Sequence, residues 1–580
     1  MRINCHTHVF NAKSVFNKYT IEILLKRLSG TDIPEPLKTA VDKQLKQVIA
    51  ETGDYVDEKK FFQNVLTQLS DTKAYKGLLK DIKPSLKIEF DIIGSDKIKE
   101  ASADALAKLI SKICEAFESA DKDVRRKDVL DFLDFLRIAL QPSVRNVTDI
   151  IVNQLPNQSD GLIALMMDIT QDGKDNGQFE RQLKDTSDMV LAYPGRLFPF
   201  IAVNPNRPNH LQLMERALNG MGFTGVKLYP SLGYEIDSPA MYAIYAYCEE
   251  RQIPVLMHCS KGGFKYDDQY TDYSSPMHWK KILENFRNLK ICFGHFGGDE
   301  CHAGLPEIDG KPPWGGMILQ LMEQYPNVYA DIAYHTAPMD GGKTEDIYFR
   351  NLKSYLGPEK YADRILWGSD YFLVRQRLRE KNHWNYIQAM LGRDLFTRIA
   401  DINPTRYLGL DPKERSWAID NYVQFVSRNS QHVETMPAPW LIKAVRDAHG
   451  DSVVFQASPL GRAWSRNNKV HYTLYEDFNH MEFLEPTPFE SSGSIKLSAM
   501  AYWRDLRLGS SQMAKMNLRR RAVQLISVFD QKGAIPALID GKRIKKEQMI
   551  QKMCAVLKDG SKTVADLGAL CDSLFDFETA

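Results

Sequence analysis

Several features that would place a protein in a special class are missing from this sequence. No apolar run reaches the roughly 18 residues that a membrane-spanning helix needs. Positive and negative side chains almost cancel, with 75 Lys and Arg against 74 Asp and Glu and a formal net charge of +1. A chain without excess charge has no general attraction for nucleic acid or for an anionic membrane. We therefore expect neither of these as a partner.

The cysteines also lack organisation. There are eight in 580 residues, and none forms a CxxC pair or a dense framework, which argues against a disulfide scaffold. Cys5, Cys259 and Cys292 lie in or beside apolar runs, where a free thiol is a small buried side chain. A cleaved leader of roughly 15–30 residues would remove His6 and His8. If those histidines function, we expect a cytoplasmic protein.

The length predicts two or three structural units, and the middle of the chain alternates between strand and helix patterns. Eight short apolar runs have strand length, most of them separated by a helical pattern: 3–8, 162–168, 197–203, 222–228, 253–258, 289–295, 328–332 and 364–370. Helices are expected at 210–219, 237–251, 279–286, 314–325 and 347–356.

This alternation predicts an α/β fold with a parallel sheet. Continuous apolar strands that alternate with helices are typical of a parallel sheet covered by those helices. Eight such units favour a closed (β/α)8 TIM barrel. The alternative, an open doubly wound sheet, usually carries a Gly-rich phosphate turn after its first strand, and none is present. The sequence favours the barrel.

The rest of the chain falls into two further regions. We expect the barrel to comprise residues 1–11 and 160–410, a helical insertion to cover 12–159, and a C-terminal accessory unit of mixed α/β character to cover 411–580. The clearest periodic patterns in these regions predict helices at 96–120, 129–140, 514–529, 546–557 and 564–575 and strands at 453–456 and 470–475. Neither region carries a catalytic motif. His471 and the segment 476–480 suggest a second metal site, but a solvated turn is the better interpretation because their spacing matches no familiar ligand pattern.

The first strand carries the most distinctive pattern. His6 and His8 are two residues apart, so in an extended strand their imidazoles point to the same side. Two neutral imidazoles at one strand end make half of a divalent metal site. Taken alone, the pair is equally well explained as two surface or half-buried histidines.

Other strand ends supply the remaining ligand types. Catalytic groups of a β/α barrel sit at the C-terminal ends of its strands, and His258, His295 and Asp370 end the fifth, sixth and eighth runs. Asp168, Lys227 and Asp331 end or nearly end the second, fourth and seventh. Imidazoles with one carboxylate suit Zn²⁺ first, with Mn²⁺, Fe²⁺ or Co²⁺ as alternatives. Such a metal ion lowers the pKa of water and polarises a carbonyl, with His295 or Asp370 suited to move the proton.

These residues resemble a known family. The resemblance is carried by His6-Thr7-His8, Val203-Asn204-Pro205, 222–228, 255–258, Ser275-Pro276 with Trp279, 293–298, 366–370 and 403–409. In that order they are similar to the amidohydrolase superfamily, and most similar to its amidohydrolase 2 branch, which is related to aminocarboxymuconate-semialdehyde decarboxylase. The resemblance covers residues 1–11 and about 160–410 and leaves both added regions unexplained.

The resemblance implies a role for each matching residue. His6, His8, His258 and Asp370 correspond to the metal ligands, and His295 to the residue that orients or deprotonates the metal-bound water. Lys227 lies on the strand that carries a carboxylated lysine in two-metal members. This branch usually holds one metal ion, so Lys227 is expected to bind substrate or to pack as a long side chain.

We expect a metal-dependent hydrolase that acts on an amide, lactone or ester bond of a small carboxylated substrate. The alternative is a non-oxidative decarboxylase on the same scaffold, since fold and ligands do not separate the two. In decarboxylating relatives the first histidine pair is sometimes altered, and here it is intact. A third interpretation is a non-catalytic binding module. Lys227, Tyr229 and Arg375 are candidates to hold a substrate anion, although salt bridging or packing explains them as well. Whether the chain forms a homo-oligomer is left open.

Overall fold

The computed structural model describes most of the barrel and parts of the two added regions. It describes residues 1–15, 35–50, 58–71, 135–170 and 178–449, with short breaks at 137, 142, 158, 266, 306–312, 358–360, 376, 414 and 436. Toward the C-terminus it describes 534–536, 538–539, 542–558 and 573–577, and elsewhere the single positions 110, 522, 526 and 570.

Eight parallel strands form one sheet in sequence order, which confirms the predicted (β/α)8 barrel. The strands are β1 (Ile3–His8), β2 (Gly161–Leu165), β3 (Leu197–Ala202), β4 (Gly225–Leu228), β5 (Val255–His258), β6 (Ile291–Gly294), β7 (Val328–Asp331) and β8 (Ile365–Leu366). Every strand residue is buried. Burial on both faces explains why the strands appear in the sequence as continuous apolar runs rather than as alternating ones.

The barrel closes through backbone hydrogen bonds between β1 and the residues that follow β8. Cys5 N donates to Trp367 O and Asp370 N donates to His6 O, each at 2.8 Å. A β-carbon at Gly368 would lie 2.7 Å from Cβ of His6, which is closer than side-chain carbons approach. The close approach of the two strand ends therefore requires glycine at position 368.

Strand β1 carries a bulge where it bears the histidine pair. Its pairing with β2 runs from Asn4 opposite Leu162 to Thr7 opposite Ala164, so β1 has one residue more than its partner between these points. An extra residue in one strand re-aims the side chains beside it. Here the bulge includes His6.

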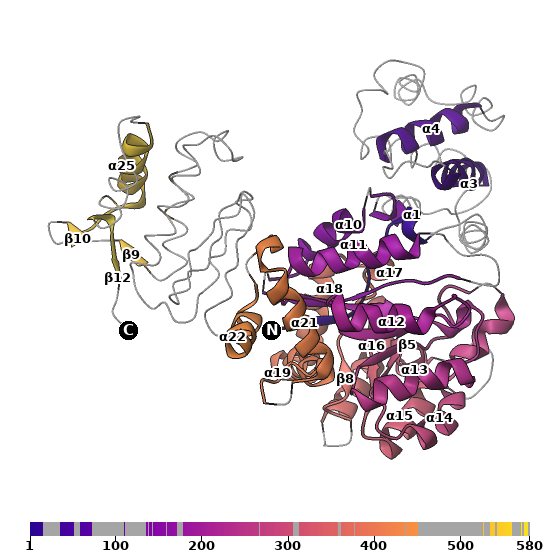
Figure 1. The fold of residues 1–580 in the computed structure, drawn as a ribbon. Coiled ribbons are helices and arrows are strands. Elements are labelled where there is room, and N and C mark those ends of the chain that lie inside the picture. The colour runs from indigo at the N-terminus through magenta and orange to yellow at the C-terminus, as the bar shows by residue number, and fades with distance from the viewer. Residues whose placement is uncertain are drawn as a thin grey trace. The chain divides into compact units, whose positions relative to one another are not determined.

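Helices lie outside the strands, as Figure 1 shows for α12 to α16. They are α11 (Phe179–Ala192), α12 (His210–Gly220), α13 (Pro239–Glu250), α14 (Trp279–Asn285), α15 (Trp314–Gln324), α16 (Gly342–Leu356), α17 (Tyr371–Val374), α18 (Glu380–Leu391) and α19 (Arg393–Thr397). All five predicted helices are present, and α16 begins five residues before its predicted start. The α13 helix has a clear start signal, because Ser238 caps Met241 N and Pro239 occupies the first turn.

The N-terminal end of the barrel is tied by helix α20 (Asn403–Leu408). Asn403 Nδ2 donates to the carbonyls of Ala362 and Ile365 at 2.9 and 2.7 Å, and Tyr407 OH donates to Val255 O at 2.8 Å. Ile365 and Val255 begin strands β8 and β5. The segment that closes the barrel region in sequence therefore holds the end opposite the predicted site.

The described parts of the predicted insertion are helical. Between β1 and β2 lie α1 (Ala12–Val15), α3 (Glu35–Ala50), α4 (Glu58–Asp71) and α10 (Val144–Val152). Asn64 Nδ2 on α4 donates to Gln44 Oε1 on α3 at 2.9 Å. The predicted helix at 96–120 and most of the one at 129–140 lie outside the described residues.

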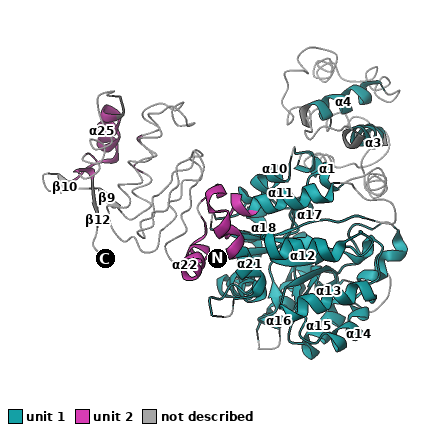
Figure 2. Ribbon diagram, viewed as in Figure 1, with its two compact units in different colours: residues 1–189, 197–422 teal, residues 190–196, 423–580 magenta. Residues whose placement is uncertain are grey.

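The chain divides into two compact units, shown in Figure 2. The first comprises residues 1–189 and 197–422, and the second comprises 190–196 and 423–580. Within the second unit, Glu434 N and Ala438 N donate to the carbonyls of Leu191 and Pro194 at 2.8 and 2.9 Å, just before α22 (Pro439–His449). The domain boundaries proposed from the sequence, at 11/12, 159/160 and 410/411, stay predictions.

The described C-terminal elements include both short strands and a helix. They are the antiparallel pairs β9 (Ala534–Pro536) with β12 (Phe575–Phe577) and β10 (Leu538–Ile539) with β11 (Lys542–Arg543), together with α25 (Lys546–Lys558). Helix α25 matches the prediction for 546–557, whereas Phe575 is a strand residue rather than a helix end. Position 522, position 526 and the last residues before β12 are helical; the other predicted elements after 450, together with His471 and 476–480, lie outside the described residues.

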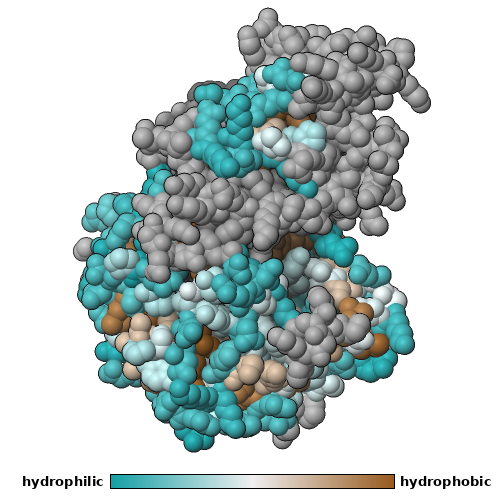
Figure 3. Space-filling model, turned by 90° about the vertical axis from the view of Figure 1, so that its right-hand side faces the viewer, coloured by the Kyte–Doolittle hydropathy of each residue, from teal (hydrophilic) through white to brown (hydrophobic). Residues whose placement is uncertain are grey.

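Of the helices in the described part of the chain, none combines the length and the apolar character that a membrane span needs. On the face shown in Figure 3, the described surface is largely hydrophilic, with small separate apolar patches. Among the described residues, the large hydrophobic side chains that are exposed are Met277, Leu305, Tyr334 and Ile402. Scattered exposed side chains of this kind are ordinary.

The contact at Gly368 gives a first prediction. We expect Gly368→Ala to lower the free energy of unfolding by about 1–3 kcal/mol, because the added carbon forces β1 and the end of β8 apart. It should also weaken metal binding, since His6 is the residue displaced. Chemical denaturation and metal titration measure the two effects.

Gly316→Ala is the matched control. Gly316 lies within α15, and the nearest atom to its added carbon is Pro313 Cγ at 3.8 Å. Alanine favours a helix over glycine by up to about 1 kcal/mol, so this variant should be at least as stable as the natural protein. Equal stability of the two variants would contradict the role given to Gly368.

Candidate metal and catalytic site

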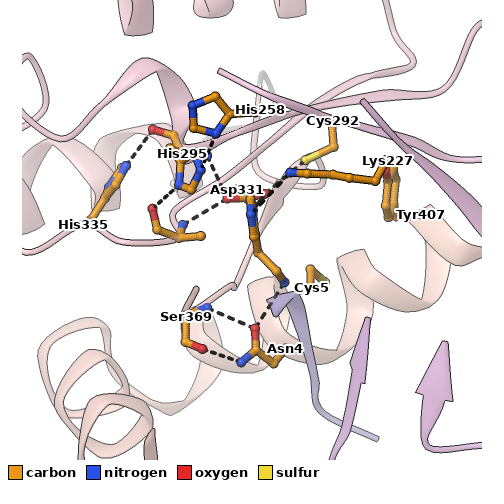
Figure 4. Close-up of polar contacts among 12 residues, drawn as sticks. Asn4, Cys5, Lys227, His258, Cys292, His295, Asp331, His335, Ser369 and Tyr407 are labelled. Carbon is orange, nitrogen blue, oxygen red and sulfur yellow. Dashed lines mark hydrogen bonds and ion pairs between the residues drawn. The ribbon is translucent and has the colours of Figure 1, made fainter. Parts of the chain in front are cut away.

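The sequence-predicted site residues gather at the C-terminal end of the barrel. His6 and His8 lie on β1, Lys227 on β4 and His258 at the end of β5. His295 directly follows β6, Asp331 ends β7, and Asp370 comes four residues after β8. Figure 4 shows His258, His295, Asp331 and Lys227 turned toward one another. The rule that strand ends converge in a β/α barrel therefore explains the cluster.

Among the residues that the structure describes, two groups of side chains have the spacing to hold a metal ion. They are His6, His8 and Asp370, and His6, His295 and Asp331, and in each group the potential ligand atoms lie within 4.8 Å of one another. All five residues are buried. His6 belongs to both groups, so it is the centre of the site.

Asp331 orients His6 instead of offering a free ligand oxygen. Its Oδ2 lies 2.9 Å from His6 Nδ1, and its Oδ1 accepts from the backbone N–H groups of His295 and Ala333 at 2.9 and 3.0 Å. A carboxylate only accepts, so it fixes the His6 proton on Nδ1 and leaves the electron pair on Nε2. This arrangement favours the group of His6, His8 and Asp370 as the ligand set.

A buried network behind β1 holds the same group in place. Asn4 Oδ1 accepts from His6 N at 3.2 Å and Ser369 N at 3.0 Å, while Nδ2 donates to Ser369 Oγ at 2.6 Å and Glu380 Oε1 at 2.7 Å. One amide thus uses its full bonding capacity. The Asn4 side chain therefore connects Ser369, the residue before Asp370, with the backbone of His6. Figure 4 shows Asn4 beside Ser369.

The residues present fit a metal ion. Nδ1 of His8 is buried and has no hydrogen-bond partner, whereas nearly all buried polar atoms in proteins have one. The rings of His6 and His8 lie 5.5 Å apart between centroids, as the two-residue spacing predicts. Burial lowers the pKa of both imidazoles well below the usual range, and Lys227 adds to the effect. Neutral imidazoles are the form that binds metals.

Asp370 occupies an unusual position for a carboxylic acid. Its φ is 54°, in the left-handed region that few residues other than glycine adopt. Burial raises its pKa to about 7; Lys227 opposes this rise and Asp331 adds to it. The side chain is 4 % exposed. Strain and a displaced pKa in one buried acid are typical of a functional residue.

Both ring nitrogens of His295 have a hydrogen-bond partner. Nδ1 lies 3.0 Å from Ala333 O. A carbonyl oxygen only accepts, so the neutral ring carries its proton on Nδ1 and an electron pair on Nε2. Burial is the largest cause that lowers the pKa of His295 well below its usual range. The ring can therefore take up a proton at Nε2.

His258 lies against His295, and it belongs to neither metal-spaced group. Its Nδ1 is 3.1 Å from His295 Nε2, and its own Nε2 lies 3.3 Å from Gly262 O and 3.4 Å from Ser260 Oγ. A β-carbon at Gly263 would lie 2.4 Å from that Nε2, so the backbone of the loop after β5 covers this atom. The assignment of His258 as a metal ligand stays a prediction.

Lys227 is a buried cation inside the cluster. Its Nζ lies 3.5 Å from His6 Nε2 and 5.6 Å from the centroid of the Tyr229 ring. Burial lowers the pKa of Lys227 to about 8, against the opposing effect of Asp331 and Asp370. Lys227 is therefore part of the site rather than an exposed side chain.

The other two predicted substrate contacts differ from each other. The Tyr229 ring stacks on His258 with 4.1 Å between centroids, and its hydroxyl accepts from Phe264 N at 2.7 Å. Arg375 instead lies 5.2 Å from the ring centroid of Tyr371 and donates to the Tyr371 hydroxyl. Tyr229 thus belongs to the site wall, and Arg375 is engaged by α17. The substrate roles of both stay predictions.

Several strand-end and buried residues have a role that sequence reasoning left open or missed. Asp331 was noted only for its place at a strand end, and Asn4 was not singled out at all. Asp168 forms a buried ion pair with Arg207 at 2.7 Å. This pair joins the segment after β2 to the segment after β3. The thiols of Cys5, Cys259 and Cys292 are buried and their pKa values are raised well above the usual range, which argues against thiol chemistry.

Comparison with known proteins supports the family resemblance for the barrel region. Residues 166–410 match the family described as Amidohydrolase. No curated protein matches this chain. Solved structures that resemble it at low identity include an uncharacterised TIM-barrel protein from Bordetella bronchiseptica, with 19 % identity, a TM-score of 0.34, and 45 % of this chain and 82 % of that chain covered.

Two further solved structures match a similar fraction of this chain. A probable 2-pyrone-4,6-dicarboxylic acid hydrolase from Acinetobacter baumannii, solved with citric acid bound, has 14 % identity, a TM-score of 0.33, and 50 % and 93 % coverage of this chain and of that chain. An amidohydrolase from Mycobacterium avium subsp. paratuberculosis has 16 % identity, a TM-score of 0.30, and 46 % and 74 % coverage.

The raised pKa of Asp370 predicts a pH-dependent stability. In the unfolded chain this acid ionises near its ordinary pKa of 3.8, and in the folded, metal-free protein it keeps its proton up to about pH 7. The folded state therefore binds more protons in this window, and its stability falls as the pH rises. We expect metal-free Asp370→Asn to become more stable than the natural protein as the pH rises from 5 to 8, by up to a few kcal/mol at about 1.4 kcal/mol per pKa unit.

Asp331→Asn is the matched control, because it changes a second buried acid of the same site with the opposite effect. Its carboxylate accepts hydrogen bonds from His6, His295 and Ala333. The NH₂ group of an asparagine would face one of these N–H donors instead of accepting from it. We expect this variant to lose about 2–4 kcal/mol at every pH. Urea unfolding of chelator-treated proteins measures both, and a pH-independent effect of Asp370→Asn would refute the assignment.

Proposed function

We propose that the protein is a metal-dependent hydrolase, because residues 166–410 match the family described as Amidohydrolase. Its substrate is a small carboxylated molecule, and the bond cleaved is an amide, lactone or ester. The observation that carries the proposal is the buried group of His6, His8 and Asp370, with ligand atoms within 4.8 Å, at the catalytic end of the barrel.

We propose that His6, His8 and Asp370 hold one divalent ion, with His258 as a further ligand if its ring is freed from the loop at Gly263. Mixed imidazole and carboxylate ligands suit Zn²⁺, with Mn²⁺, Fe²⁺ or Co²⁺ as alternatives. A metal ion bound there would act as a Lewis acid and lower the pKa of a water molecule toward neutrality.

The charges of the site support a cation and an anionic substrate. Asp370 must ionise to bind a metal ion, and once it has done so its carboxylate and that of Asp331 outweigh the ammonium of Lys227 by one negative charge. A divalent cation would reverse the sign and leave one net positive charge in a buried setting. A positive site attracts a substrate carboxylate, and Lys227 with the Tyr229 hydroxyl would hold it.

His295 is the residue proposed to move the proton. Its Nδ1 is fixed by Ala333 O, so Nε2 is the atom that accepts a proton from water and later returns it to the leaving group. Asp331 keeps His6 oriented, and the loop around Gly263 excludes water from His258. Each of these proposed roles is supported by a hydrogen bond or a close contact within the chain itself.

The decarboxylase is the competing enzyme, and product analysis separates the two. Full-length protein should be purified, its metal content measured, and carboxylated lactones, esters and amides tested with that metal restored. We expect acid release without CO₂. Release of CO₂ would identify the lyase, and full activity after chelation would contradict any metal-dependent chemistry.

Single substitutions distinguish ligands from the proton carrier. We expect His8→Gln and Asp370→Ala to lose metal and activity together, whereas His295→Gln should keep its metal and lose roughly 10²–10⁴-fold in kcat. His278→Gln is the control, because His278 is an exposed histidine that pairs with Asp272 at 3.1 Å. Its metal content and activity should be unchanged. Metal bound normally by His8→Gln would disprove the ligand set.

A further inference from the structure

His295 is held in a conformation that needs support. Its φ is 62° and that of the next residue, Phe296, is 45°. Residues other than glycine pay roughly 1–3 kcal/mol for such backbone angles and keep them only where the surroundings enforce them. The contacts of His295 therefore show which residues enforce the geometry of the candidate proton carrier.

Hydrogen bonds hold His295 at its backbone and at its ring, and its carbonyl also accepts from Gly298 N at 2.7 Å. Its backbone N–H donates to Asp331 Oδ1 at 2.9 Å, and its Nδ1 donates to Ala333 O at 3.0 Å. Its backbone carbonyl lies 2.9 Å from Nε2 of His335, as Figure 4 shows. Asp331 and Ala333 lie at or just after the end of β7, and His335 follows in the next turn, where no pattern in the sequence distinguishes it.

The partners of His335 assign both of its nitrogens. The carbonyl of His295 only accepts, so His335 carries its proton on Nε2. Its Nδ1 then has an electron pair, which accepts from the Tyr348 hydroxyl at 2.7 Å. His335 is 2 % exposed and Tyr348 is 1 % exposed, so water does not compete for these bonds. Both nitrogens are committed, and His335 itself has none left for proton transfer.

The turn that carries His335 is itself anchored. Asp299 Oδ2 accepts from the backbone N–H groups of Thr336 and Ala337, both at 2.7 Å. The His335 ring also lies against that of His302, with 5.7 Å between centroids. Tyr348 belongs to helix α16 on the outside of the barrel. A chain of buried contacts therefore runs from an outer helix through His335 to the backbone of His295.

We propose that Tyr348 and His335 are positioning residues that hold His295 in its left-handed conformation with its proton on Nδ1. The inference rests on the proposed function of His295 as proton carrier. Tyr348 fixes the His335 proton on Nε2, and that N–H restrains the His295 carbonyl. Because His295 is then rigid, its Nε2 is kept at the position where it faces His258 Nδ1. A pair that merely stabilised the fold would leave the proton position and backbone of His295 unchanged.

The test compares Tyr348→Phe with Tyr245→Phe in the full-length protein. Tyr245 is an equally buried tyrosine on α13, and its hydroxyl donates to Ile236 O at 3.1 Å. Both variants lose one buried hydroxyl bond, so both should lose similar stability. We expect Tyr348→Phe to lower kcat about tenfold or more, with KM and metal content unchanged, and Tyr245→Phe to leave kcat unchanged.

Substitution of His335 gives a second, independent test of the proposal. Glutamine can still donate to the His295 carbonyl and accept from Tyr348, so His335→Gln should retain most of kcat, whereas His335→Phe should lose it. NMR of protein labelled with ¹⁵N in histidine should show the His295 proton on Nδ1 in the natural protein. In Tyr348→Phe it should show a mixture of the two neutral tautomers, with the proton on Nδ1 in some molecules and on Nε2 in others. A crystal structure of that variant should show a changed φ at His295.

The two kinds of readout separate this inference from the proposed function. If the natural protein shows neither hydrolase nor lyase activity, the proposed function fails, and the NMR and crystal measurements still decide whether His335 positions His295. An equal loss of kcat in Tyr348→Phe and Tyr245→Phe would overturn the proposal. An unchanged proton position and φ at His295 in Tyr348→Phe would overturn it as well.

Discussion

The closure of the barrel between β1 and the end of β8 is the constraint on which the candidate site depends. Two short backbone bonds, from Cys5 to Trp367 and from Asp370 to His6, join segments separated by more than 360 residues. The missing side chain of Gly368 permits that approach, and Asn4 reinforces it by bonding both sides. Without this contact His6 and His8 would be an isolated pair on one strand. With it, they share a buried space with Asp370.

The same closure concentrates groups that water would otherwise stabilise. Four histidines, two carboxylates and one ammonium lie together with little access to solvent, and burial opposes the charged form of each. The direction of the pKa changes reflects this conflict: the imidazoles become harder to protonate and Asp370 becomes harder to ionise. Asp331 accepts hydrogen bonds from His6, His295 and Ala333. Functional sites commonly contain clusters of buried ionisable groups that lower the stability of the fold. A bound cation would offset the cost of burying the carboxylates.

Much of this arrangement could be predicted from the sequence, because it follows from local periodicity and one rule of topology. Apolar runs of strand length located all eight strands, and the rule for strand ends brought His6, His8, His295 and Asp370 to one place. What could not be predicted depends on register and loop conformation. The β1 bulge, the orienting role of Asp331 and the contact of His258 with His295 leave no pattern in the sequence. His335 lies in a turn next to Tyr334, whose backbone has a left-handed conformation. The sequence gives no sign of that conformation.

The geometry of His295 also bears on which reaction the site performs. Hydrolysis begins by taking a proton from water, which needs a base, whereas decarboxylation ends by giving a proton to carbon, which needs an acid. His295 carries its one proton on Nδ1, where Ala333 O holds it, and burial lowers its pKa well below the usual range. At neutral pH the nitrogen that faces His258 is therefore an electron-pair donor and not an acid. If His295 is the proton carrier, as we propose, its basic form favours hydrolysis as the proposed reaction, because the lyase reaction would have to draw its proton from Lys227 or Asp370 instead.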